Sequence, residues 1–172
     1  ENTQIDMRHH LIAAGPRFDE QLENMVETIR NIGRAGIPMY TMSWRYPRFY
    51  RTGHVDVGFG AQGTAFDADV EDWPNVIDWE LTRERAWECL ETWVKTATPV
   101  AEEYGMRLGL HPVDPPIPVV GGVPSLLFNF ENYRRLIEIY DSPANALLLC
   151  QGSFSQFAGA DQDDGESIYD MI

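Results

Sequence analysis

The chain has 172 residues, and 44% of them are hydrophobic, which is enough for a sizeable core. Its 27 acidic and 13 basic side chains give a formal net charge of −14, which disfavours nucleic acid as a partner. The sequence shows no apolar run of membrane-spanning length and no hydrophobic signal core, and its two cysteines are too few for a disulfide framework. We therefore expect a cytoplasmic protein with reduced thiols that binds neither nucleic acid nor membrane.

The first part of the chain predicts two strands and a long helix. Residues 8–14 (RHHLIAA) suggest a short strand, and residues 19–34 carry Leu22, Val26 and Ile29 at helical spacing. A second strand follows at residues 37–42. Residues 43–78 show no sustained period, and we expect a long lid or binding loop there.

The second part alternates between helix and strand. Thr82 is a good cap for a helix that ends at Gly105, and a strand follows at residues 106–110. Asn129 caps a helix to about residue 140, and residues 146–149 form the last predicted strand. This alternation is typical of a parallel α/β fold.

The spacing of these units favours one type of α/β fold. About 40 residues per unit and four units predict part of a (β/α)8 barrel. A doubly wound sheet is the competing architecture, but no glycine-rich phosphate loop follows any strand. We treat residues 1–172 as one domain and expect an incomplete barrel cut at its C-terminus and at its N-terminus, since a helix that starts near residue 166 stops almost at once.

Two apolar runs end in residues that can bind a metal. MRLGLHPVDPP breaks at His111, and NALLLCQGS breaks at Cys150. Functional groups collect at the carboxyl ends of parallel strands, and the interval of one strand-helix unit makes the two strands neighbours. One divalent ion can then contact both side chains. The alternatives are that His111 caps its strand by hydrogen bonding and that Cys150 is an ordinary buried small hydrophobe.

Positive charge gathers in the long loop. Arg45, Arg51 and His54 could bind a carboxylate substrate, with Arg51 the best single candidate, or they could only balance nearby acids. Trp44 could line the same substrate pocket or simply pack.

Two further residues adjoin the expected metal ligands. Asp114 follows the histidine in a proline-rich turn and could accept a hydrogen bond from the His111 ring, or it could be a turn residue. Gln151, directly after the cysteine, is expected to support the site in the same way.

Four segments resemble the mannonate dehydratase family, from about Leu22 to the end of the chain. They are NIGRAGIP at residues 31–38, YRTG at residues 50–53, TPVAEEYGMRLGLHP at residues 98–112 and SPANALLLCQGSFS at residues 142–155. The last two are long and specific. The resemblance implies a xylose-isomerase-like TIM barrel, here in a piece of about four β/α units.

The resemblance also implies a reaction and a site. The reaction is the dehydration of D-mannonate to 2-keto-3-deoxy-D-gluconate in hexuronate catabolism, by an enzyme expected to be a homo-oligomer. The metal is Mn²⁺, with Fe²⁺, Co²⁺ or Zn²⁺ as other choices. His111 and Cys150 carry over as metal ligands, and a further His and an Asp are expected beyond Ile172, so the piece alone should be inactive.

Position 113 departs from the family pattern, because Val113 stands where typical members read HPDDPP. Two alternatives to the dehydratase are a sugar isomerase or epimerase on the same type of barrel and a non-catalytic paralogue.

Overall fold

A computed structural model describes residues 9–45, 51–70 and 75–159. Its centre is a three-stranded parallel sheet in the order β1-β4-β7, formed by Met39–Ser43, Arg107–His111 and Asn145–Leu147. The prediction of an α/β fold with a parallel sheet is confirmed, and all three strands lie where the sequence placed them to within a few residues.

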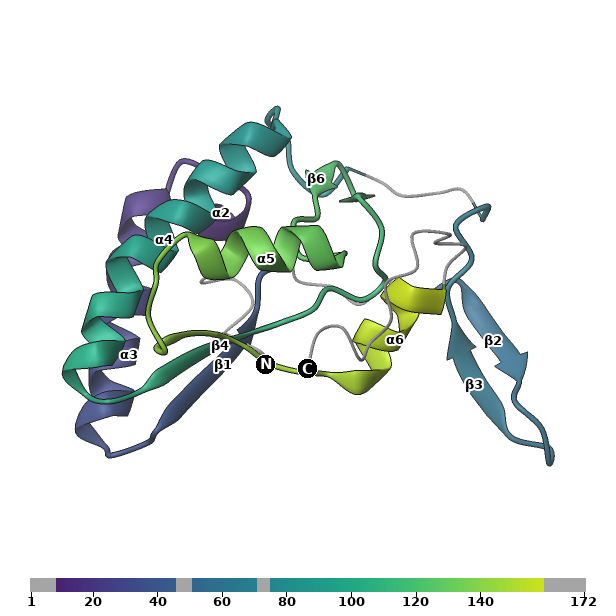
Figure 1. Ribbon diagram of the computed structural model, residues 1–172. Helices are drawn as coiled ribbons and strands as arrows, with labels where there is room; N and C mark the ends of the chain where they lie inside the picture. The colour runs from purple at the N-terminus through teal and green to yellow at the C-terminus, as the bar shows by residue number, and fades with distance from the viewer. Residues whose placement is uncertain (1–8, 46–50, 71–74, 160–172) are drawn as a thin grey trace.

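Three long helices alternate with these strands: α3 (Phe18–Arg34), α4 (Arg83–Glu103) and α5 (Phe130–Glu138). Both predicted caps form. The Thr82 side chain accepts a hydrogen bond from the backbone N–H three residues later at 3.2 Å, and the Asn129 side chain does the same at 2.9 Å. Helices α3 and α4 run side by side against the sheet (Figure 1).

The two faces of the sheet differ in burial. Side chains alternate between faces along a strand, and one alternating set, Met42, Leu108 and Leu110, is at most 5% exposed within the core that the helices share. The other set includes Met39 and its register partner Arg107, both exposed. His111 belongs by alternation to this second, more open face.

The predicted strand at residues 8–14 is wrong in the part that the structure describes. Residues His9–Ile12 form the short helix α2, and Arg8 lies outside the described residues. Leu11 is fully buried, and its N–H donates to the Gln21 side chain of α3 at 2.9 Å. A short apolar run fits a buried helix as well as a strand, and packing on α3 decided it. The described residues therefore contain three parallel strands rather than four.

The predicted long loop contains a hairpin. Strands β2 (Gly53–Asp56) and β3 (Gln62–Ala65) pair antiparallel, and the hairpin points away from the rest of the fold (Figure 1). Its turn uses Gly58 and Gly60 at φ of 95° and 78°, angles that favour glycine. The glycines interrupt the alternation of apolar and polar residues that normally identifies strands in a sequence. A second, very short hairpin joins β5 (Val119–Val120) to β6 (Val123–Pro124).

Helix α6 (Gln151–Gly159) follows Cys150 directly and was not predicted. The helix expected from about residue 166 lies outside the described residues. Among the described helices, none combines the length and apolar character needed to cross a membrane.

Replacing Asn145 with alanine should destabilise the protein. Asn145 is 8% exposed, and its Nδ2 lies 3.0, 3.4 and 3.2 Å from the carbonyl oxygens of Leu136, Ile137 and Tyr140 at the end of α5. Loss of this donor leaves buried carbonyls unsatisfied and should cost about 2 kcal/mol. Denaturant unfolding of the full-length protein measures the change in the free energy of unfolding. Asn24→Ala, at an exposed helical position, should leave that free energy unchanged, and equal stability of both variants would refute the role of Asn145.

Candidate metal and substrate site

The two expected metal ligands lie at the same end of the sheet. His111 is the last residue of β4, and Cys150 comes shortly after β7, the strand that pairs with β4. The pairing continues beyond β7, because the Leu148 N–H donates to the Leu110 carbonyl at 3.0 Å. The predicted adjacency of the two strands is confirmed.

The His111 ring is oriented by its own backbone neighbour. Nδ1 lies 2.6 Å from the carbonyl oxygen of Pro112, and the side chain is partly buried. A carbonyl can only accept, so Nδ1 carries the proton in this contact. The neutral ring then has its lone pair on Nε2, which is the form that binds a metal.

Cys150 is placed to form a thiolate. The Ser153 hydroxyl donates to Sγ at 3.4 Å, and this bond is the main cause of a lowered pKa for the Cys150 thiol, with help from the backbone N–H groups of Ser153 and Gly152. Burial and the nearby Asp114 carboxylate oppose the shift. The other cysteine, Cys89, behaves in the opposite way, because burial raises its pKa. A thiolate is the form of cysteine that binds metals.

The donor set fits one side of a metal site. Imidazole nitrogen together with thiolate sulfur suits divalent ions such as Mn, Fe, Co or Zn, with sulfur favouring the later ones. Within residues 9–45, 51–70 and 75–159, no group of three or more His, Cys, Asp or Glu side chains could hold a metal. His111 and Cys150 are thus two candidate donors, fewer than a complete metal site needs.

A pocket of about 620 Å³ lies against the segment that follows His111, although neither His111 nor Cys150 is among its described lining residues. Beside it, an Arg51 guanidinium nitrogen lies 2.6 Å from an Asp114 carboxylate oxygen, and the side chains are 31% and 18% exposed. The Arg51 Nε also donates to the Thr64 hydroxyl at 3.4 Å. The pocket thus lies where the base of the hairpin, the segment after β4 and helix α6 meet. Its described lining residues are Arg51, Thr64, Phe66, Ala68, Asp114, Pro115, Pro116, Ile117 and Gln156.

Arg51 is the only predicted substrate residue that lines this pocket within the described part of the chain. Trp44 is 2% exposed and packs on Trp93 of α4 at 5.5 Å between ring centroids, so the packing alternative describes its position. Arg45 is half-buried just after β1, and His54 is exposed on β2. Their contact with a substrate stays a prediction.

The structure gives Asp114 a different partner from the one expected. Its carboxylate pairs with Arg51, whereas the His111 ring faces the Pro112 carbonyl. Gln151 is exposed at the start of α6. Any support of the metal ligands by Asp114 or Gln151 stays a prediction.

Sequence reasoning missed Ser153 and the residues from β3 and α6 that line the pocket. Ser153 could have been found, because a serine three residues after a cysteine at a helix start can reach its sulfur. Thr64, Phe66 and Gln156 carry no such local signal, since only the tertiary fold brings them to Arg51.

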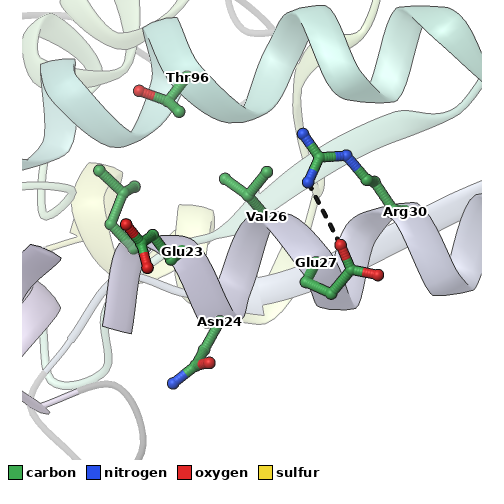
Figure 2. Close-up of a pocket in the computed structure, with 7 residues that line it drawn as sticks. Glu23, Asn24, Val26, Glu27, Arg30 and Thr96 are labelled. Atoms are coloured by element: carbon green, nitrogen blue, oxygen red, sulfur yellow. Dashed lines mark hydrogen bonds and ion pairs between the residues drawn. The ribbon is translucent and has the colours of Figure 1, made fainter. Parts of the chain in front are cut away.

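A second hollow of about 440 Å³ lies between α3 and α4 (Figure 2). Glu27 and Arg30 point toward one another at its rim and form an ion pair at 3.2 Å. Val26 and Thr96 line it from the two helices. Its lining offers one ion pair and the separate carboxylate of Glu23 on an exposed helix surface, which is no grouping of ligand-binding residues.

The chain is an α/β protein built on a parallel sheet. Its candidate functional groups, His111 and a cysteine of lowered pKa, lie at the carboxyl ends of adjacent strands, where such folds commonly carry their sites. The model of the D-mannonate dehydratase (UxuA) family matches residues 77–165, which is more than half of the chain and includes His111 and Cys150. The chain belongs to this family.

Individual relatives agree with the family assignment. The mannonate dehydratase of Streptococcus pneumoniae (strain 70585) is 30% identical over 167 residues, covering 81% of this chain and 45% of the relative. Mannonate dehydratase 2 of Halalkalibacterium halodurans is 26% identical over 166 residues, covering 80% of this chain and 47% of the relative. The crystal structure of mannonate dehydratase from Streptococcus suis serotype 2 superposes with a TM-score of 0.78 at 26% identity, covering 94% of this chain and 47% of that one. The chain spans about half the length of the relatives it matches.

Cys150 should react with iodoacetamide at a lower pH than an ordinary thiol, whereas Cys89 should stay unreactive in the folded protein. The lowered pKa of Cys150 populates its thiolate below the usual range, and the raised pKa and burial of Cys89 do the reverse. Peptide mass mapping of metal-free protein across pH measures both rates.

Ser153→Ala should move the pH dependence of Cys150 alkylation upward, because it removes the largest cause of the lowered pKa. Cys89 serves as the internal reference in the same samples. An unchanged pH profile for Cys150 in this variant would show that the hydroxyl does not stabilise the thiolate.

Proposed function

We propose that the whole protein is a mannonate dehydratase that removes water from D-mannonate to give 2-keto-3-deoxy-D-gluconate. The observation that carries the proposal is the placement of His111 and Cys150 at the ends of neighbouring strands, inside the segment that matches the family. The small-molecule substrate is a sugar acid.

The three-stranded sheet is, in this proposal, part of a (β/α)8 barrel of the xylose-isomerase-like type. Parallel pairing of β1, β4 and β7, with intervening helices that bury one face of the sheet, supports it. The more open face, which carries His111, would be the interior of that barrel. A further His and an Asp, from protein outside this chain, complete the metal site.

His111 and Cys150 hold a divalent metal in this proposal, Mn²⁺ in the first instance and Fe²⁺, Co²⁺ or Zn²⁺ as other choices. The bound metal supplies Lewis-acid stabilisation of negative charge that develops on substrate oxygens. The Pro112 carbonyl orients the His111 ring so that Nε2 offers its lone pair to the metal. The Ser153 hydroxyl stabilises the Cys150 thiolate in the metal-free protein.

The reaction breaks two bonds of the sugar acid. A base takes the proton from the carbon next to the carboxylate, and the hydroxyl on the following carbon leaves with a proton as water. The resulting enol gains a proton on carbon 3 and becomes the 2-keto acid. The pocket beside Arg51 and Asp114 binds the substrate next to the ligand pair, which holds it in register for both bond cleavages.

Full-length protein loaded with Mn²⁺ should convert D-mannonate to a 2-keto-3-deoxy acid, measured by a colorimetric assay for that product. Incubation in D₂O with aldoses and ketoses is the counter-test. Deuterium incorporation without loss of water, together with no product from mannonate, would assign the protein to sugar isomerisation instead.

His111→Ala and Cys150→Ala should each abolish tight metal binding, because each removes one of the donors. Metal content after dialysis, measured by elemental analysis, is the readout. The matched controls are His54→Ala, on the exposed hairpin, and Cys89→Ala, inside α4. Normal metal content in either ligand variant would place the metal elsewhere.

A further inference from the structure

Two charged side chains that line the pocket, Arg51 and Asp114, form an ion pair. A guanidinium nitrogen of Arg51 and a carboxylate oxygen of Asp114 lie 2.6 Å apart, and the two side chains are 31% and 18% exposed. The pair presents a strong donor and a strong acceptor side by side while its net charge is close to zero.

A compensated pair is a poor receptor for a carboxylate. An anion brought to Arg51 would also approach the Asp114 carboxylate, and like charges at close range cost several kcal/mol. The chain as a whole carries a net charge of −14, which does not draw an anion toward the molecule from a distance. A hydroxyl group has no such conflict, because it can accept from the guanidinium and donate to the carboxylate.

We infer that this pocket binds the hydroxyl-bearing end of the sugar acid, distant from its carboxylate, through the Arg51–Asp114 pair. The inference rests on the proposed function and deepens it. It assigns the carboxylate end of the substrate to the side of His111 and Cys150, and the polyol tail to the side of the hairpin.

The rest of the pocket suits a polyol chain. Thr64 and Gln156 add groups that can both donate and accept hydrogen bonds, and Phe66 and Ile117 with the two prolines provide apolar walls. Carbon-bound hydrogens of a sugar chain can pack on such walls while its hydroxyls face the polar groups. The volume of about 620 Å³ lies within the usual range of small-molecule sites.

The pocket is built from the two segments that follow the proposed metal ligands. Asp114 lies three positions after His111, and Gln156 belongs to α6, the helix that begins directly after Cys150. A short extended substrate would pass from the ligand pair into this pocket along these two segments.

The test combines variants with substrates of different length. Binding of D-mannonate is compared with that of a four-carbon sugar acid of the same configuration at the two reacting carbons, using metal-loaded full-length protein and titration calorimetry, with kcat/KM measured in parallel. Asp114→Ala and Arg51→Gln should each weaken binding of the six-carbon acid about tenfold, as expected for a lost hydrogen bond to a charged group. Binding of the four-carbon acid should change less than twofold.

Two controls separate this role from a structural one. Asp69→Asn removes an exposed carboxylate that does not line the pocket and should leave both affinities unchanged. Arg51→Lys keeps the charge and should recover part of the six-carbon affinity. Metal content and melting temperature are measured for every variant.

Two other outcomes overturn the inference. Equal weakening for both acids would show that the pair contacts the carboxylate end or acts only on structure. Tighter binding of both acids to Asp114→Ala would identify Arg51 as the carboxylate receptor, with Asp114 as its competitor. Absence of turnover by the wild type, with length-dependent binding intact, would instead refute the dehydratase proposal and leave the pocket assignment standing.

Discussion

The parallel pairing of β4 with β7 is the constraint on which the site depends. The register Leu108↔Asn145, Gly109↔Ala146 and Leu110↔Leu147 brings the carboxyl ends of both strands to one edge, where His111 and Cys150 follow. A slip by one residue would turn each side chain of β7 to the other face of the sheet. Asn145 opposes such a slip, because its side chain also binds the carbonyls that end α5. The end of α5 therefore helps to fix the register that places His111 and Cys150 at the same edge of the sheet.

The strand pairing sets where His111 and Cys150 lie, whereas local contacts set the protonation state of their side chains. The Pro112 carbonyl, one residue away, selects the His111 tautomer, and the Ser153 hydroxyl, three residues away, favours the Cys150 thiolate. Both contacts form within a single loop or the first turn of a helix, so they persist without metal. In the proposed function, a site prepared in this way would lose little conformational freedom on binding the ion, and proton release would be reduced because the thiol already ionises more readily.

Sequence reasoning succeeded where the signal was local and failed where tertiary packing decided. The periodicity of α3 and the capping residues Thr82 and Asn129 are local signals, and all three helices formed as predicted. Residues 8–14 carried an apolar run without a clear period, and burial of Leu11 against α3 made it helical. The Arg51–Asp114 pair joins residues 63 positions apart, so no spacing rule could reveal that Asp114 pairs with Arg51.

In the proposed function, the same pair eases a conflict between the charge of the chain and that of a sugar acid. An acidic protein with a net charge of −14 repels an anionic ligand at long range, although salt screens this effect beyond about 8 Å. Close to the site, an uncompensated Asp114 beside a Cys150 thiolate would concentrate negative charge, which attracts a metal cation but repels the substrate. Arg51 cancels one of these charges and still leaves the Asp114 oxygens available as acceptors. In this proposal, the pair would thus reduce repulsion of the anion without adding a second anion receptor that would compete with the proposed metal for the carboxylate.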